Sequence, residues 1–214
     1  MAYVAKQHAL YLNGLEQAGV SDHTDVVSRH VNSPNLDITH LPIDWRSGAA
    51  FFDLFEMTKA RTEQLLRMYG RAALVGASGG GGLALNVFQE LRSRDQELKL
   101  SLICLNARLR VGNLMTLGAE ATDFADKGMV PAYIDSVLRC ESEAVPNLTE
   151  ADRRLMRTVT PLADKVVPTD AMRIPGVANL VVPVSGHFRG IAKGLLIIPE
   201  ILDDIGVESP PVDN

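Results

Sequence analysis

The segment from Ala72 to Leu85 constrains the fold more than any other part of the chain. It reads Ala-Ala-Leu-Val-Gly-Ala-Ser-Gly-Gly-Gly-Gly-Leu-Ala-Leu, so an apolar run ends at Gly76, four glycines follow Ser78, and an apolar periodic segment begins at Leu83. This order predicts a buried strand, a sharp turn and a helix. Each glycine in the first turn of a helix costs about 1 kcal/mol relative to alanine. Helix stability alone therefore does not explain four of them in a row.

Ser78 stands at the tip of this turn, in the pattern Gly76-Ala77-Ser78-Gly79-Gly80. A Gly-x-Ser-x-Gly sequence between a strand and a helix is typical of a nucleophile elbow, which holds a serine hydroxyl out at the edge of a sheet. Because a serine hydroxyl is a weak nucleophile, it needs a base to take its proton and an acid to orient that base.

The same glycines allow two other interpretations. Gly76 to Gly82 is similar to the glycine motif of short-chain dehydrogenases, which brings a backbone close to the pyrophosphate of NAD(P). A tight turn without any chemistry is the simplest alternative. A Walker A loop is excluded, because Gly82-Leu83 stands where Lys-Ser/Thr is required.

Composition indicates one globular domain over residues 1–208, followed by a polar, proline-rich tail at 209–214 that we expect to be frayed. The 214 residues are 46% hydrophobic and carry a net charge of −5, which gives no electrostatic basis for nucleic-acid binding. Two cysteines form neither a disulfide framework nor a zinc ligand set, so we expect a reduced, cytoplasmic setting. No apolar run reaches the length of a membrane span.

Short apolar runs alternate with helical patterns along the chain, which predicts an α/β fold with a mostly parallel sheet of about six strands flanked by helices. A helical face is expected from Phe51 to Tyr69, and a final helix from Ile191 to Ile205 with a break or bend at Pro199. The expected strands are His8–Leu12, Leu36–Leu41, Arg71–Val75, Leu98–Leu105, Met156–Thr160 and Ala178–Val184.

Residues 109–155 interrupt the alternation. They contain several glycines and prolines, with helical patterns at Ala119–Lys127 and Ala132–Cys140. The segment is long for a simple crossover helix. It is either a small helical lid over the edge of the sheet or an elaborate crossover.

The candidate base and acid both follow Ser78 in the chain. His187 is the only histidine after the glycines, and it comes directly after the expected strand Ala178–Val184. The candidate acid is Asp164, in Pro161-Leu-Ala-Asp-Lys-Val-Val-Pro168, with Asp170 as its rival. Asp170 precedes Ala171-Met172 in a pattern that favours the start of a helix.

These motifs together resemble the α/β-hydrolase superfamily over nearly the whole chain. The order Ser78, Asp164, His187 and the Asp-x-x-Val-Pro pattern after Asp164 are similar to those of its members, and Pro42-Ile-Asp-Trp-Arg46 resembles a stretch often found after an earlier strand. The chain has Asn13-Gly14 where many members have His-Gly.

The resemblance implies a compact serine hydrolase with Ser78 as nucleophile, His187 as base and Asp164 as acid. It implies an oxyanion hole built from the backbone N–H groups of Leu15 and Gly79. It further implies a small ester, thioester or related acyl compound as substrate, with no cofactor and no metal. A hydrolase fold that serves only as a binding module is a further hypothesis.

The dehydrogenase hypothesis fits fewer residues. Its glycine motif normally opens the chain, whereas here two expected strands come before it. Its Tyr-x-x-x-Lys motif is missing, because Tyr133 is followed four positions later by Val137. Arg108, just after the next expected strand, could still accept a 2′-phosphate of NADP, so this alternative stays open.

Overall fold

A computed structural model describes residues 6–15, 31, 35–45, 49–111 and 130–208. Its centre is a six-stranded sheet in which every described strand pairing is parallel, in the order β2-β1-β3-β4-β5-β6. This confirms the α/β fold with a parallel sheet. The strands are β1 Gln7–Leu12, β2 Leu36–Leu41, β3 Ala72–Ala77, β4 Leu100–Leu105, β5 Met156–Ala163 and β6 Ala178–Ser185.

All six expected strands are present, and their bounds differ from the prediction only at the ends. β3 continues to Ala77, so the strand leads directly into Ser78. β5 and β6 also run farther than expected, to Ala163 and Ser185, and so end next to the candidate acid and just before the candidate base. The longer strands therefore bring both segments to the carboxyl edge of the sheet.

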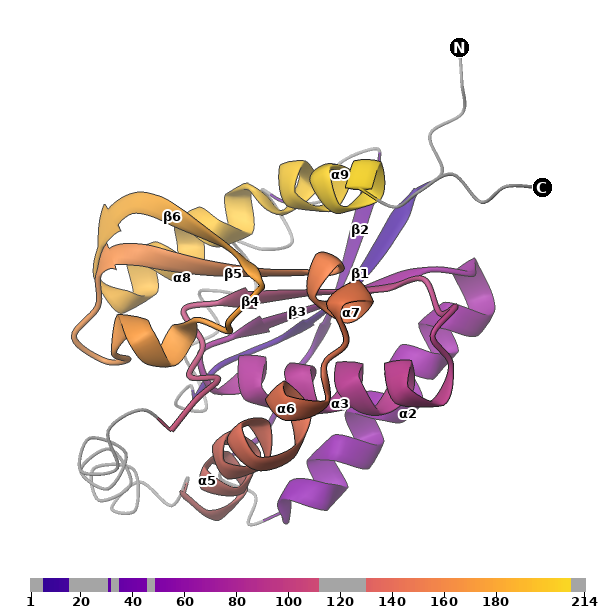
Figure 1. Ribbon diagram of the computed structural model, residues 1–214, viewed down its shortest axis with the longest axis horizontal. Helices are drawn as coiled ribbons and strands as arrows, with labels where there is room; N and C mark the ends of the chain where they lie inside the picture. The colour runs from indigo at the N-terminus through magenta and orange to yellow at the C-terminus, as the bar shows by residue number, and fades with distance from the viewer. Residues whose placement is uncertain (1–5, 16–30, 32–34, 46–48, 112–129, 209–214) are drawn as a thin grey trace.

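Helices cover both faces of the sheet and make three layers (Figure 1). The helices α2 and α3 pack on one face with α5, and α8 and α9 pack on the other. Their bounds are α2 Phe51–Tyr69, α3 Gly79–Arg94, α5 Val130–Arg139, η1 Cys140–Ala144, α6 Val145–Asn147, α7 Glu150–Arg154, η2 Thr169–Met172, α8 His187–Leu196 and α9 Ile198–Glu208.

The side chains of each central strand alternate between the two cores, as the period of a strand requires. In β3, Leu74 faces the layer of α2 and α3, while Ala73 and Val75 face α8 and α9. Both faces are apolar because both are covered, which explains why the central strands appear in the sequence as continuous apolar runs.

The C-terminal helix is divided, as its sequence suggested, but α8 ends at Leu196 and α9 begins at Ile198. Pro199 therefore lies in the first turn of α9, where the missing N–H of proline costs no helix hydrogen bond. The first of the two helices begins at His187, four residues earlier than expected.

The described part of the 109–155 segment packs on the body of the protein. Tyr133, Val137 and Cys140 are buried in the same core as α3. The helix expected at Ala119–Lys127 and the tail 209–214 lie outside the described residues. The lid therefore stays a prediction.

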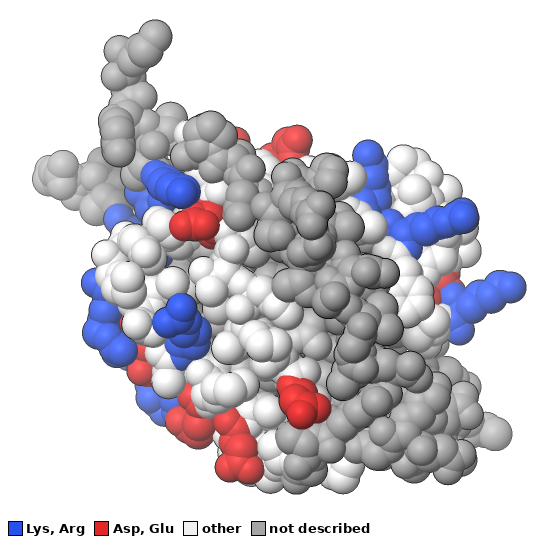
Figure 2. All heavy atoms as spheres, turned by 180° about the vertical axis from the view of Figure 1, so that it is seen from behind, with Lys and Arg blue, Asp and Glu red and all other residues white. Residues whose placement is uncertain are grey.

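Charged side chains of both signs lie mainly around the margin of the face seen from behind, and the described surface near its centre is largely uncharged (Figure 2). The described part of that face therefore lacks the extended basic surface on which a nucleic-acid backbone binds. None of the described helices combines the length and the hydropathy that crossing a membrane would require.

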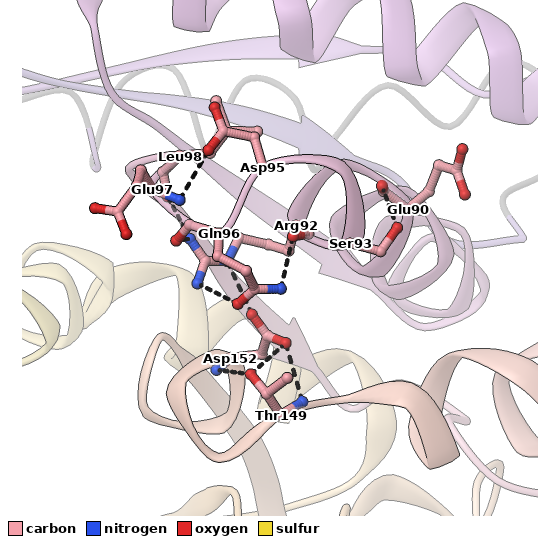
Figure 3. Close-up of polar contacts among 9 residues, drawn as sticks. All are labelled: Glu90, Arg92, Ser93, Asp95, Gln96, Glu97, Leu98, Thr149 and Asp152. Atoms are coloured by element: carbon pink, nitrogen blue, oxygen red, sulfur yellow. Dashed lines mark hydrogen bonds and ion pairs between the residues drawn. The ribbon is translucent and has the colours of Figure 1, made fainter.

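A buried ion pair joins the end of α3 to α7 near the amino edge of the sheet (Figure 3). The Arg92 Nε donates to Asp152 Oδ1 at 2.8 Å, and Arg92 Nη1 donates to the Leu98 carbonyl at 2.8 Å. Asp152 Oδ2 accepts from the Thr149 hydroxyl at 2.7 Å and from its backbone N–H at 3.0 Å. Thr149 in return caps α7 through the backbone N–H of Asp152, so the ion pair and the helix cap share one carboxylate.

Candidate active site

Ser78 occupies the turn between β3 and α3 in a strained conformation. Its φ of 48° and ψ of −121° lie in a region that residues with a side chain rarely adopt. Its backbone N–H donates to the Leu105 carbonyl at 2.9 Å, which ties the turn to the end of β4. The strand, turn and helix predicted for this segment are confirmed.

The glycines after Ser78 allow the first turn of α3 to lie directly on neighbouring backbone. A Cβ on Gly80 would lie 2.5 Å from the Asn13 carbonyl oxygen, and one on Gly81 would lie 2.2 Å from the Ala107 Cβ. Since carbon atoms do not approach so closely, neither position has room for alanine. Close packing between α3 and the ends of β1 and β4 thus accounts for two of the four glycines.

Asp164 and His187 lie together at the carboxyl edge of the sheet. The distance between His187 Nδ1 and Asp164 Oδ2 is 2.8 Å, and their side chains are 5% and 0% exposed. Asp164 directly follows β5, and His187 is the first residue of α8, two positions after β6 ends. Because parallel strands end at the same edge, two residues 23 positions apart in sequence become neighbours.

The second oxygen of Asp164 is held by the loop that follows it. Its Oδ1 accepts from the backbone N–H groups of Val166 at 2.7 Å and Val167 at 3.1 Å. Burial alone would raise the pKa of this carboxyl, but the hydrogen bond and charge of His187 and the two backbone donors together hold the pKa below its ordinary value. Asp164 is therefore an ionised acceptor that can orient the imidazole.

Asp170 does not share this arrangement. It lies in η2 and is exposed, whereas Asp164 is the carboxylate that contacts the imidazole. The expectation that Asp170 belongs to the start of a short helix agrees with its position in η2.

Ser78 and the Asp164–His187 pair share one edge of the sheet, but no hydrogen bond joins Ser78 Oγ to the His187 ring among the described residues. The backbone just after β1 lies close to the hydroxyl. A Cβ on Gly14 would lie 2.7 Å from Ser78 Cβ and 3.3 Å from Ser78 Oγ. The Gly14 backbone therefore lies directly beside the serine side chain.

The two residues expected to supply oxyanion donors flank Ser78. Gly79 is the first residue of α3, and the N–H groups in the first turn of a helix have no partner within the helix. The Leu15 side chain lies over it, since a Cβ on Gly79 would be 3.0 Å from Leu15 Cγ. Leu15 and Gly79 are thus neighbours around the serine.

Asn13 takes the place where many hydrolases have a histidine, and its side chain fixes the loop after β1. Its Oδ1 accepts from the Ile43 N–H at 2.7 Å, and its Nδ2 donates to the Ile43 carbonyl at 3.2 Å. The sequence indicated Asn13 only as a departure from the family pattern. Its partner is 30 residues away, so no local signal could have identified this contact.

The strand order places Ser78 and the loop after β1 at a topological switch point of the sheet. From β1 the chain moves to β2 on one side and then to β3 on the other, and the carboxyl ends of two such strands are where ligands commonly bind in open α/β sheets. The strand order also differs from the 3-2-1-4-5-6 order of the dinucleotide-binding fold.

A separate cavity of about 510 Å³ lies near the opposite, amino edge of the sheet, beside Arg92 and Leu98. We place the candidate site at the carboxyl edge because the strained serine and the acid–base pair lie there.

No protein-family model and no curated relative matches the chain, but many solved structures resemble it. Human thioesterase 2 is 16% identical with a TM-score of 0.59, over 96% of this chain and 98% of that one. Carboxyl esterase 2 from the fungus Tuber melanosporum is 14% identical with a TM-score of 0.64, over 96% and 77%. A structure from a study of LipS and LipT, two metagenome-derived lipolytic enzymes, is 13% identical with a TM-score of 0.64, over 95% of both chains. With the parallel six-stranded sheet and its strand order, these similarities establish that the chain has the α/β-hydrolase fold.

Proposed function

We propose that the protein is a serine hydrolase that cleaves a small ester, thioester or related acyl compound. The observation that carries the proposal is the buried contact between His187 and Asp164, at the same sheet edge as a serine in a strained turn. A buried, ionised aspartate bound to an imidazole nitrogen is the arrangement that turns a histidine into a general base. The esterases and thioesterases among the similar structures support the same chemistry.

In the proposed reaction, the free ring nitrogen of His187, Nε2, takes the proton of the Ser78 hydroxyl as its oxygen attacks the acyl carbon. The carbonyl oxygen becomes an oxyanion, which the N–H groups of Leu15 and Gly79 stabilise. The imidazolium then gives its proton to the departing alcohol or thiol, and the acyl group stays on Ser78. Water, deprotonated by His187, attacks this acyl-enzyme; the bond to Ser78 Oγ breaks, His187 returns the proton to that oxygen, and the carboxylic acid is released.

Asp164 stays ionised throughout and contributes by orientation. Its contact with Nδ1 keeps the proton of neutral His187 on that nitrogen, so that Nε2 is left as the acceptor. It also stabilises the positive charge that the ring carries after proton transfer.

The surroundings of the site favour an acyl group that is at least partly apolar. Leu15 and the Tyr133 ring lie over Gly79, since a Cβ there would be 3.4 Å from Tyr133 Cδ2. Next to the acid–base pair, Leu162 and Phe188 are 63% and 60% exposed. Such surfaces can bury a hydrocarbon chain while the polar groups act on the carbonyl.

The test is hydrolysis of p-nitrophenyl acetate and butyrate without added cofactor, with Ser78→Ala and His187→Ala as variants. Since the triad acts as a unit, each variant should lower kcat/KM by about 10³-fold or more, and the double variant little further. A fluorophosphonate probe should label Ser78, as peptide mapping would show. Near-wild-type turnover by Ser78→Ala would refute the proposal, and saturable NADPH binding would support the dehydrogenase alternative.

A further inference from the structure

Asn106 is the second strained residue of the described chain. Apart from glycines, only Ser78 and Asn106 among the described residues have a positive φ, and both have a value of 48°. Ser78 directly follows β3, and Asn106 directly follows the neighbouring strand β4. Asn106 is completely buried, and its Oδ1 has no hydrogen-bond partner within the described part of the chain. Strain and an unpaired buried acceptor both cost stability, and such costs are typical of functional sites.

The hydrogen bonds of Asn106 connect the nucleophile segment to the base segment. Its side-chain Nδ2 donates to the backbone carbonyl of His187 at 2.7 Å. The carbonyl of the preceding residue, Leu105, accepts the backbone N–H of Ser78 at 2.9 Å. The carbonyl that binds Ser78 is therefore covalently bonded to the nitrogen of Asn106, the residue that binds His187.

Two further bonds extend these contacts to β5 and β6. The Asn106 N–H donates to the Val159 carbonyl of β5 at 2.9 Å. The Gly186 N–H, next to His187, donates to the Ala163 carbonyl, next to Asp164, at 2.8 Å. These four hydrogen bonds link the segments that carry the serine, the acid and the base, and among the four only the bond from Asn106 Nδ2 involves a side chain.

Helix α8, which begins at His187, has a glycine where it contacts the Asn106 side chain. A Cβ on Gly190 would lie 2.2 Å from Asn106 Nδ2 and 2.9 Å from Asn106 Oδ1. The Asn106 amide therefore packs directly on the backbone of Gly190, in the first turn of α8. A larger residue at position 190 would displace either the amide or the helix.

We propose that Asn106 is a positioning residue that sets the distance between Ser78 and His187. It does so by holding the His187 carbonyl at a fixed place relative to the end of β4. This role rests on the proposed hydrolase function. Among the described residues, Asn106 makes no hydrogen bond to Ser78 Oγ or to the His187 ring, so its loss should lower kcat and leave KM nearly unchanged.

The experiment distinguishes the effect of losing the Asn106 amide from the effect of losing its positive φ. It compares the variants Asn106→Gly, Asn106→Ala and Gly190→Ala. Glycine adopts a positive φ readily but lacks the amide, whereas alanine lacks both properties. Asn106→Gly should therefore keep the Tm closer to that of the wild type than Asn106→Ala does. It should still lower kcat by about 10- to 100-fold, the loss expected for a catalytic group misplaced by about 1 Å. Gly190→Ala should give a similar loss of kcat, although it leaves Asn106 intact.

Asn179→Ala is the matched control. Asn179 lies at the amino end of β6, and its side chain bonds Thr158 and Thr160 far along the strand from His187. Its removal should leave kcat within about twofold of the wild type, since it does not touch the catalytic groups. Wild-type kcat in Asn106→Gly would overturn the inference, because Asn106 would then serve only to tolerate the strained backbone.

A readout without turnover distinguishes failure of this inference from failure of the hydrolase proposal. A proton between His187 Nδ1 and Asp164 should give a low-field NMR signal, identified by its loss in His187→Gln. In Asn106→Gly this signal should broaden or disappear, and in Asn179→Ala it should persist. An unchanged signal in Asn106→Gly would refute the inference even if the wild type proved inactive. Absence of probe labelling at Ser78 in the wild type would refute the hydrolase function instead.

Discussion

Asp152 and Asp164 are both buried carboxylates that lie 2.8 Å from a basic nitrogen, yet they lie near opposite edges of the sheet. The partner of Asp152 is Arg92, which keeps its charge at every ordinary pH. The partner of Asp164 is His187, and an imidazole can act as a general base and a general acid within one reaction. The first pair can only fix two helices together, whereas the second can take part in proton transfer.

The remaining hydrogen bonds of the two carboxylates differ in the same way. Asp152 is bound by a threonine that also caps α7, so its contacts belong to regular structure. Asp164 is bound by backbone N–H groups of a loop at the end of β5. In each case burial opposes ionisation and the hydrogen bonds outweigh it, so the pKa lies below its ordinary value. A lowered pKa therefore does not by itself mark the functional pair.

The largest difference between the two pairs is expected in activity. Asp164→Asn should lower kcat/KM by about 10²- to 10³-fold, because an amide no longer holds the imidazole in the productive tautomer. Asp152→Asn should leave kcat/KM within about threefold, since Asp152 lies near the other edge of the sheet. Ester hydrolysis at neutral pH measures both. Equal losses of kcat/KM in the two variants would contradict a catalytic role that is specific to Asp164.

The next difference is expected in stability. Arg92→Met leaves the Asp152 carboxylate buried without its cation and should cost about 3–5 kcal/mol. For a chain of this length that corresponds to a fall in Tm of roughly 6–20 °C. Thermal unfolding followed by circular dichroism measures it.

Arg94→Met is the matched control for that change. Arg94 pairs with Glu90 on the exposed side of the same helix, where an ion pair is worth less than about 1 kcal/mol. The variant Arg92→Met/Asp152→Asn should recover part of the stability lost in Arg92→Met, because no unpaired charge stays buried. A Tm for Arg92→Met equal to that of Arg94→Met would mean that the buried pair contributes nothing.

The smallest effect is expected for Thr149→Val, at about 1 kcal/mol near pH 7. Thr149 lowers the pKa of Asp152, and a carboxyl with a lowered pKa in the folded state stabilises the fold above its unfolded pKa. That contribution disappears as the pH falls through the folded pKa. The stability difference between Thr149→Val and wild type should therefore shrink below about pH 4.

Urea unfolding at pH 7 and pH 3.5 tests this pH dependence, with Thr149→Ser as the control variant that keeps the hydroxyl. A difference that is the same at both pH values would show that only the helix cap is lost.

The sequence predicted the parts of the molecule that depend on local pattern. The six strands follow from apolar runs between helical segments, and the turn at Ser78 follows from the glycines around it. The sequence also predicted that Asp164 and His187 lie at the same edge of the sheet, because both residues follow strands of one parallel sheet.

The contacts that the sequence did not reveal join residues whose own neighbourhoods look ordinary. Arg92 and Asp152 are separated by 60 positions, and each resembles a charged residue on the surface of a helix. Asn106 gave one usable signal, since it is a polar residue directly after a buried apolar strand. Its partner, however, is a backbone carbonyl 81 positions away, and a backbone group has no sequence signature.

The first described strand and the last helix lie side by side, away from the candidate site (Figure 1). Gln7 Nε2 donates to Asp203 Oδ1 at 3.4 Å, so the two ends of the described fold are within reach of a short linker. Chains whose ends meet in this way tolerate circular permutation. The protein could thus be fused or attached to a surface at its joined ends, with the carboxyl edge of the sheet left accessible.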